Sequence, residues 1–331
     1  MVGNVFGIFN FNPYKMNIGI DTMGGDFAPL EALRGIKKYL SENKDNHTIR
    51  LTLFGDVQEL NRIITEEAIS TDRIQVVPTT QVIDMHEHPT KALKEKPHSS
   101  IATGFHYLAK DKTDAFISAG NTGAMLVGAL FNLKTIEGIL RPVISSIIPK
   151  QGGRTGLILD VGLNADCKPE QLNQFATLGA VYARHILEIP DPKVGLVNVG
   201  EEEGKGNLLT QGAYPLLKAN KAIHFIGNIE GRDTFNDKAD VMVCDGFTGN
   251  IILKLAESIY DITQKEGLEN AYLNRFNFEI YGGTPVLGVE KPVIIGHGIS
   301  KATAFCNMIY VAEKMLQTGV LQKLKEAVQQ R

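Results

Sequence analysis

Four short runs of the sequence combine glycine with small polar or charged residues. They are DTMGGD (21–26), SAGNTGAM (118–125), NVGEEEGKGN (198–207) and DGFTGN (245–250). Each follows an apolar run typical of a strand and precedes a run typical of a helix. Unpaired backbone N–H groups and the helix dipole stabilise an anion at such a place. We therefore expect several loops at strand ends to meet around a phosphate-like group.

The first loop allows a close backbone approach to a ligand. Gly24 and Gly25 provide that freedom, and Asp26 is a candidate cap for a helix starting near Pro29. The spacing is not the G-x-G-x-x-G pattern of dinucleotide-binding folds. A purely structural turn is the alternative reading.

The second loop places Asn121 and Thr122 where a helix cap belongs, directly before Gly123. Capping and anion binding do not compete here, because one backbone amide can serve in both. We predict that these three residues contact the ligand.

The third loop carries the most informative charge. Lys205 stands between Gly204 and Gly206, after three glutamates at 201–203. A lysine flanked by glycines can approach a phosphate as a mobile point charge. We predict that Lys205 and Gly206 bind the anion, with a solvated charged loop as the alternative. The glutamates are interpreted as solvated residues, and no metal site is predicted.

The fourth loop and a later histidine supply further polar groups. Thr248, Gly249 and Asn250 lie at a helix start, and the Asn250 amide can donate to an oxyanion. His297, in the run GHG, lies at a strand end and is a candidate general acid or substrate-orienting group. Capping for the loop, and a structural role for the histidine, are the alternatives.

Composition excludes several classes of protein. The chain has 331 residues, of which 43% are hydrophobic and 21% charged, values ordinary for a globular protein. A net charge of −3 lacks the basic footprint of a nucleic-acid-binding protein. Cys167, Cys244 and Cys306 have no metal-ligand spacing and fit a reducing cytoplasm. We predict a cytoplasmic protein without a cofactor.

The elements that position these loops alternate along the chain. Helical periodicity favours helices at 29–40, 57–69, 99–109, 123–133, 170–187, 207–219, 249–264 and 301–316. Strand-like runs lie at 17–22, 49–55, 73–78, 114–120, 142–149, 155–162, 193–200, 223–228, 239–246 and 292–298. Such alternation predicts an α/β fold with a mainly parallel sheet and helices on both faces. Residues 16–331 are assigned to this domain, and residues 1–15 to an N-terminal extension outside its core.

A basic stretch at 91–100 is a candidate partner surface. Lys91 and Lys94, with Lys96 close behind, can present a positive helical face. An ordinary solvated face is the alternative, and docking of an acidic partner is the functional reading.

Taken in order, these runs resemble the PlsX-type phosphate acyltransferases of bacterial phospholipid synthesis. The resemblance also includes LDVGLNADCKPE (159–170), FIGNIEGRD (225–233), the YGG turn (281–283) and GHG (296–298), and it covers residues 16 to about 316. It implies a fold similar to those of isocitrate and isopropylmalate dehydrogenases and of phosphotransacetylases.

The resemblance also implies an activity. The family transfers a long-chain acyl group from acyl carrier protein to inorganic phosphate, and a membrane-bound glycerol-3-phosphate acyltransferase uses the acyl phosphate. It is homodimeric. Residues matching Lys205 and Asn250 are linked to activity, and Asp160, Asn164 and His297 are expected to assist. Lys91, Lys94 and Lys96 are then the candidate dock for the carrier protein.

One departure concerns membrane contact. Many members carry a longer amphipathic stretch between DGFTGN and YGG, which is short here. The apolar positions Ile251, Ile252, Leu255, Ile259 and Ile262 are instead expected to pack against the sheet or a dimer mate, and peripheral binding at the inner membrane face stays open. A phosphotransacetylase-like enzyme acting on coenzyme A thioesters, a nicotinamide-dependent dehydrogenase and a non-catalytic carrier-binding module are the other readings.

Overall fold

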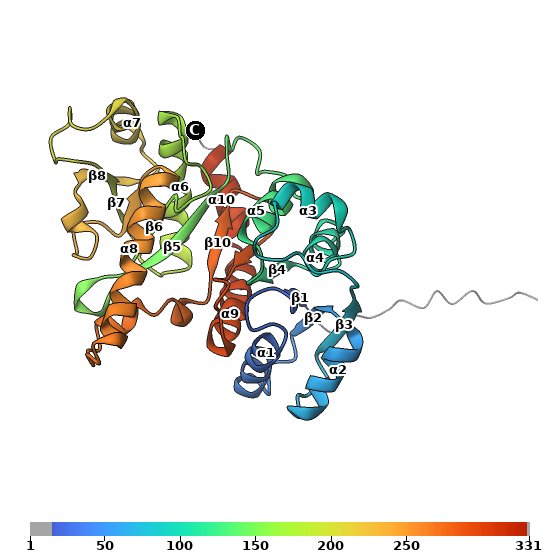
Figure 1. Ribbon diagram of the computed structural model, residues 1–331. Helices are drawn as coiled ribbons and strands as arrows, with labels where there is room; N and C mark the ends of the chain where they lie inside the picture. Colours follow the sequence, from blue (N-terminus) through green and yellow to red (C-terminus); the bar gives the residue numbers. More distant parts are fainter. Residues whose placement is uncertain (1–14, 330–331) are drawn as a thin grey trace, which may run out of the picture.

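The strands form one continuous sheet. The computed structural model describes residues 15–329 (Figure 1), and within them eleven strands follow the order β3-β2-β1-β4-β11-β10-β5-β6-β9-β7-β8. The predicted extension, except residue 15, lies outside the described residues. The strands are β1 (Met16–Asp21), β2 (Ile49–Gly55), β3 (Ile74–Pro78), β4 (Ala115–Ser118), β5 (Val143–Pro149), β6 (Thr155–Leu159), β7 (Lys193–Val197), β8 (His224–Ile229), β9 (Val241–Val243), β10 (Thr284–Leu287) and β11 (Val293–Ile295).

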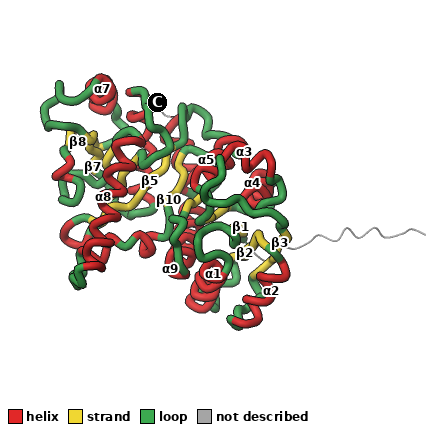
Figure 2. The backbone as a smooth tube through the Cα atoms, viewed as in Figure 1, coloured by secondary structure: helices red, strands yellow, loops and turns green. Residues whose placement is uncertain are grey.

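Helices surround the sheet, which lies in the interior (Figure 2). The α-helices are α1 (Leu30–Glu42), α2 (Val57–Glu66), α3 (Pro89–Glu95), α4 (Ser100–Ala109), α5 (Thr122–Asn132), α6 (Pro169–His185), α7 (Leu208–Ala219), α8 (Gly246–Lys265), α9 (Ala302–Thr318) and α10 (Val320–Gln329). Short 3-10 turns are η1 (Gln151–Gly153), η2 (Gly231–Asp233), η3 (Leu273–Phe276) and η4 (Phe278–Tyr281).

Both faces of the sheet are buried. In β6, Leu157 and Leu159 face one apolar core with α1, α2, α6, α7, α9 and α10, whereas Ile158 faces a second core with α3, α4, α5 and α8. In β9, Val243 and Met242 divide in the same way. Because each central strand must be apolar on both sides, its sequence is almost continuously hydrophobic. The prediction of helices on both faces is confirmed.

The ten predicted strands are all present, and one further strand lies between them. β10 falls in the polar, glycine-bearing stretch before residue 288, where no periodicity predicts it. The final helix, α10, was likewise not expected. The sheet is mainly parallel as predicted, because the exceptions among its pairings are β10 with β11, β10 with β5, and β5 with β6.

Those exceptions reverse the direction of half the sheet. β6, β9, β7 and β8 run opposite to β1, β2, β3, β4 and β11. The loops that follow β1 and β4 therefore leave the sheet at one end of the strands. The loops that follow β6, β7 and β9 leave it at the other end. This differs from the expectation that all the loops meet at one place.

Caps fix the start of three of the helices after these loops. The side chains of Asn121, Asn207 and Asp245 accept hydrogen bonds from the backbone N–H groups of Ala124, Thr210 and Thr248, at 2.9 Å in each case. The expectation for Asp26 is wrong, because α1 has Pro29 at its cap position and receives no side-chain cap.

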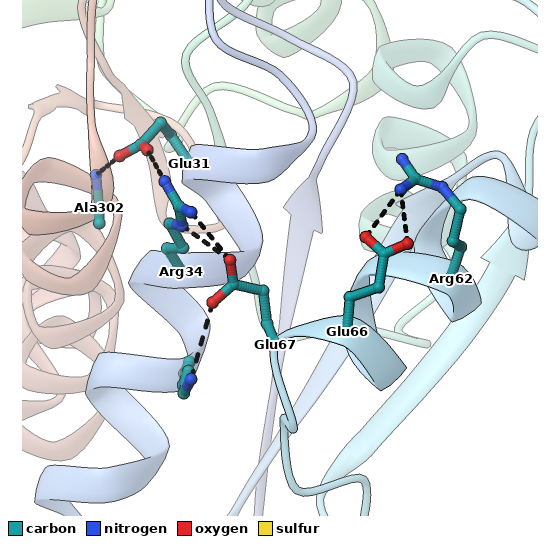
Figure 3. A network of polar contacts seen from close by, with 7 residues as sticks. Glu31, Arg34, Arg62, Glu66, Glu67 and Ala302 are labelled. Atoms are coloured by element: carbon teal, nitrogen blue, oxygen red, sulfur yellow. Dashed lines mark hydrogen bonds and ion pairs between the residues drawn. The ribbon is translucent and has the colours of Figure 1, made fainter.

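Polar contacts join α1 to its neighbours on the outer face (Figure 3). The Arg34 guanidinium lies 3.1 Å from the Glu31 carboxylate and 2.9 Å from that of Glu67. Glu31 also accepts a hydrogen bond from the backbone N–H of Ala302, which begins α9. These ion pairs lie at the surface, where solvent screens them, so they contribute little to stability. Apolar burial holds these helices to the sheet.

One lysine lies inside the second half of the molecule. Lys150, at the end of β5, is only 1% exposed, and its ammonium donates to the carbonyl oxygen of Thr234 at 2.7 Å. Burial lowers the pKa of Lys150 to about 8, although the nearby carboxylates of Asp240 and Asp237 act in the opposite direction. Keeping this ammonium charged in the folded state therefore costs stability.

This cost predicts a pH-dependent stability. The cost of keeping Lys150 charged is fully present below pH 8, and it disappears as the pH rises toward the ordinary lysine pKa of 10.5. Between about pH 7 and about pH 9.5, wild type should gain about 2 kcal/mol of unfolding free energy relative to Lys150→Met. Urea titrations at both pH values measure this difference. Lys221→Met, at an exposed lysine, should run parallel to wild type, and a parallel curve for Lys150→Met would contradict the assignment.

Candidate active site

A cavity of about 330 Å³ lies over β5, between the two halves of the sheet. Helix α8, which crosses in front of β5 and β6 in Figure 1, forms one wall. The η3–η4 segment and the 296–298 turn close it, and Thr122 and Met85 complete the lining. Its apolar wall consists of Ile144, Ile147, Ile148, Leu253, Phe276 and Phe278.

The polar end of the cavity combines residues from distant parts of the chain. Asn250 and Lys254 are one helical turn apart on α8 and share a face. The Lys254 Nζ lies 3.4 Å from Nε2 of His297 and 2.7 Å from the Glu257 carboxylate. The Asn250 side chain is exposed and makes no hydrogen bond to another described residue, so its amide is available to a ligand.

The environment of His297 favours the neutral imidazole. Burial lowers its pKa below the usual 6.5, and the positive charge of Lys254 lowers it further. The ring also lies beside Phe278, with the two centroids 5.1 Å apart. At neutral pH, a neutral imidazole can donate a hydrogen bond to a substrate or accept one from it.

The first glycine loop contacts the 296–298 turn of the cavity wall. The backbone N–H of Asp26 donates to the carbonyl oxygen of Gly298 at 2.8 Å, which fixes the turn that carries His297. A Cβ atom on Gly24 would lie 2.7 Å from the backbone of Gly120, so the first two loops touch only because both are glycine-rich. Gly24, Gly25 and Asp26 do not line the cavity.

Asn121 is engaged within the protein. Beyond its cap, the side-chain amide donates to the carbonyl oxygens of Asp84, Met85 and Glu87 at 2.9, 3.1 and 3.0 Å. Its neighbour Thr122 lines the cavity at the start of α5. The structure thus separates the two residues, with Thr122 lining the cavity and Asn121 fixing the loop beside it.

The loop after β6 contributes Val161 to the cavity lining and also lies beside Asn250. The buried Asp160 carboxylate accepts hydrogen bonds from the N–H groups of residues 162–164 and, at 2.7 Å, from the Asn164 side chain. Burial raises the pKa of Asp160, and these hydrogen bonds partly offset the effect. A Cβ on Gly162 would lie 3.5 Å from the Asn250 amide. Asp160 and Asn164 therefore shape the loop against Asn250.

The Lys205 loop lies outside the cavity lining. Two of its three glutamates have partners: Glu201 pairs with Lys238 at 2.6 Å and Glu203 with Lys218 at 3.0 Å. Lys205 itself forms no ion pair with the residues that the structure describes. Gly206 has a φ of 97°, and a Cβ there would lie 2.2 Å from the Asn198 side chain, so only glycine fits. The loop leaves the sheet beside the one that carries Thr248, Gly249 and Asn250, because β7 and β9 are parallel neighbours.

The basic stretch divides between surface and interior. Lys91 and Lys94 are exposed on and near α3. The ammonium of Lys96 turns inward, 2.7 Å from the carbonyl oxygen of Val82 and 2.6 Å from the Glu87 carboxylate. Lys96 is therefore not part of the free positive face expected from the sequence.

Several cavity residues were not predicted from the sequence. Lys254 could have been found from its spacing of four residues after Asn250, which places both on one helix face. Met85 carries no such signal because it lies in an irregular segment, and Arg275 carries none because it lies in a single short 3-10 turn. The Arg275 guanidinium donates to the carbonyl oxygens of Lys150 and Arg154, which ties η3 to the end of β5.

Solved structures with this architecture define its class. A phosphotransacetylase from Streptococcus pyogenes superposes with a TM-score of 0.64 and 17% identity, covering 91% of this chain and 94% of that one. The EutD phosphotransacetylase from Staphylococcus aureus superposes with a TM-score of 0.62 and 15% identity, over 91% and 94% of the two chains. The fold is that of the phosphotransacetylases, as predicted.

Sequence comparison then gives the family. Residues 16–323 match the family model described as "Fatty acid synthesis protein". A phosphate acyltransferase of Halothermothrix orenii is 42% identical over 333 residues, covering 95% of this chain and 98% of that protein. A phosphate acyltransferase of Dictyoglomus turgidum is also 42% identical, over 332 residues with the same coverage. The chain belongs to the PlsX family of phosphate acyltransferases and is an acyltransferase.

Two features are absent from residues 15–329. No helix there combines the length and apolar character needed to cross a membrane. No three side chains of His, Cys, Asp or Glu in this range gather in a way that could hold a metal ion.

The contact between Lys254 and His297 predicts that the pKa of His297 depends on the charge of residue 254. Replacing Lys254 with glutamine removes the positive charge, so the pKa of His297 should rise toward 6.5. NMR titration of the imidazole C–H resonances measures it, with His297→Gln used for assignment. Lys265→Gln, an exposed lysine of the same helix, should leave the His297 pKa unchanged. Equal His297 pKa values in wild type and Lys254→Gln would refute this electrostatic coupling.

Proposed function

We propose that the protein transfers a long-chain fatty acyl group from acyl carrier protein to inorganic phosphate. A phosphate oxygen attacks the thioester carbonyl carbon, the new C–O bond replaces the C–S bond, and the carrier thiolate leaves and is protonated. The products are acyl phosphate and free carrier thiol. No acyl-enzyme forms. Family membership supports the reaction type.

The cavity is the observation that carries the choice of substrate. Its wall is aliphatic and aromatic along β5, α8 and η3–η4, and its polar groups gather around Asn250, Lys254 and His297. Each methylene that a ligand buries contributes about 0.8 kcal/mol. An acetyl group would leave most of this apolar wall in contact with water, whereas a long acyl chain would cover it.

In this proposal the polar end holds the reacting atoms. The Asn250 amide donates to the carbonyl oxygen as negative charge develops on it, and His297 and Thr122 orient the thioester. A well-placed donor of this kind contributes about 3 to 4 kcal/mol to transition-state stabilisation. Lys254 adds positive charge beside the same position.

Lys205 is proposed to hold and direct the phosphate. Its loop lies next to that of Asn250, two of its three neighbouring glutamates are paired with other cations, and it forms no ion pair with the described residues. Gly206, Thr248 and Gly249 are proposed to supply backbone N–H groups for the same anion. Asp160 and Asn164 are proposed to act by shaping the loop behind Asn250.

The cysteines near the site favour direct attack by phosphate. Burial raises the pKa of Cys167 to about 12, and burial also raises that of Cys244. Since the thiolate is the nucleophilic form, both thiols are poor nucleophiles at neutral pH. This supports a mechanism without an acyl-cysteine intermediate.

The exposed lysines suit the acidic carrier. Lys91 and Lys94 are exposed on α3, which follows the Met85 segment directly in the chain, and we propose that they meet the carrier protein. The acyl phosphate would pass to a membrane-bound glycerol-3-phosphate acyltransferase. This places the enzyme in the cytoplasm with access to the inner membrane face.

Thiol release tests the reaction. Wild type should release carrier thiol from palmitoyl-carrier protein only when phosphate is present, and Asn250→Ala should lower kcat about 100- to 1,000-fold. Lys205→Ala should raise the KM for phosphate and lower turnover strongly because it removes the positive charge. Circular dichroism checks the fold of each variant, and Lys221→Ala serves as the exposed control. Wild-type rates in Lys205→Ala would refute its role.

Two alternatives predict different donor preferences. A phosphotransacetylase-like enzyme would prefer acetyl-CoA to palmitoyl-carrier protein, in keeping with the fold. A non-catalytic carrier-binding module would bind the carrier without phosphate-dependent turnover, and its binding would not change in Lys205→Ala or Asn250→Ala.

We further propose a homodimer that covers the outer face of α8. The apolar positions predicted on this helix divide, because Ile252 and Ile259 pack against the core whereas Ile251, Leu255 and Ile262 are exposed. Leu255→Glu should convert a wild-type dimer to monomer in analytical ultracentrifugation, since it places a charge in an apolar interface. Gln264→Glu, at an exposed position on the opposite side of the same helix from Leu255, tests whether charge alone is disruptive. A dimer that persists in Leu255→Glu would exclude this face.

A further inference from the structure

The segment between β3 and α3 is irregular but tightly held. It contains residues 79–88, and its backbone is anchored at one end by Thr80, whose N–H donates to the carbonyl oxygen of His98 at 3.2 Å. Gln81 accepts a hydrogen bond from the His98 N–H at 3.0 Å. The Glu87 N–H closes a turn onto the Asp84 carbonyl oxygen at 3.2 Å. The segment is therefore placed by specific contacts.

Two side chains from other elements hold this segment from within. Lys96 donates to the Val82 carbonyl oxygen at 2.7 Å and to both carboxylate oxygens of Glu87 at 2.6 and 2.8 Å. Asn121 shares its amide among the carbonyl oxygens of Asp84, Met85 and Glu87. Charge-assisted hydrogen bonds of the Lys96 type are about twice as strong as neutral ones. We call this pair of side chains the clamp.

The clamp places Met85 in the cavity wall, beside Thr122, His297 and Gly298. A Cβ atom on Gly298 would lie 2.7 Å from Cε of Met85, so the absence of a side chain at Gly298 makes room for the thioether. Met85 is the one residue of the clamped segment that lines the cavity, and it does so at the polar end.

We propose that Met85 limits the width of the acyl group next to the reacting carbonyl, and that Lys96 and Asn121 are positioning residues that hold it there. This inference rests on the proposed function. A methionine side chain can adapt its shape to a ligand. Its backbone carbonyl, however, is fixed by Asn121. The thioether can therefore change rotamer, but the Met85 backbone cannot move away from the cavity. Straight acyl chains pass, and a branch beside the carbonyl meets the thioether.

Acyl-pantetheine donors test Met85 without the carrier protein. We measure kcat/KM for two donors, one with a methyl branch next to the carbonyl and its straight-chain counterpart. The quantity compared is the branched-to-straight ratio of kcat/KM. Met85→Ala should raise this ratio about 10-fold, because one methylene of room changes discrimination by at least that factor. Leu93→Ala, a half-buried residue of α3 that does not line the cavity, should leave it unchanged. An unchanged ratio in Met85→Ala would overturn the proposal.

The same ratio tests the clamp. Lys96→Met keeps most of the side-chain length without the charge, and it should raise the ratio with no change in the KM for phosphate. Lys96→Arg, which keeps the positive charge, should have the same branched-to-straight ratio as wild type. The double variant Lys96→Met, Met85→Ala should show no further increase over Met85→Ala, because Lys96 acts through Met85. A Lys96→Met effect seen with carrier-linked donors but not with acyl-pantetheine would instead assign Lys96 to carrier docking and overturn its positioning role.

A binding measurement separates this inference from the proposed function. Absence of phosphate-dependent thiol release in wild type would refute the function. Calorimetry with straight and branched acyl-pantetheine amides would then measure the same preference without turnover. A Kd ratio that shifts about 10-fold in Met85→Ala supports the role of Met85, and equal Kd ratios in wild type and Met85→Ala exclude it.

Discussion

The continuity of the sheet through β10 is the constraint on which the rest of the molecule depends. This four-residue strand pairs antiparallel with β11 on one side and β5 on the other. Its hydrogen bonds, together with the antiparallel pairing of β5 with β6, join two groups of parallel strands that run in opposite directions. Because of this reversal, the cavity lies over β5 between the groups and not at one shared end of the strands. Helix α8 from one group and the 296–298 turn from the other can then face each other across it.

The polar residues of the site divide into those engaged by the protein and those left available. Asp160, Asn164 and Asn121 are buried, and their side chains are occupied in shaping loops. A buried polar group without partners would cost stability, so these hydrogen bonds are required whatever the function. Asn250 and Lys205, in contrast, are exposed with no side-chain hydrogen bond to the described residues. Such residues contribute little to the fold, and their free donors suit a substrate that carries negative charge.

The sequence predicted the secondary structure well for a specific reason. Strands such as β6 and β9 are buried on both faces, so their residues must be continuously apolar, and the helices between them carry apolar residues at regular spacing. β10 escaped prediction because it lies in a polar, glycine-bearing stretch without an extended apolar run. Asp26 was assigned as a cap because its residue type is favoured there, but the chain turns at Pro29 before α1 begins.

By itself, the sequence determined the alternation of strands and helices, the glycine loops and the residues that could bind an anion. These properties are local, because they depend on residue type and on spacing within one element. Only the tertiary structure decided which of these residues meet. Thr122, Asn250 and His297 share a cavity because the antiparallel pairings of β10 and β5 reverse the sheet and α8 crosses β5. The inward turn of Lys96 is likewise set by Val82 and Glu87, contacts that depend on how the loop folds and that no residue pattern encodes.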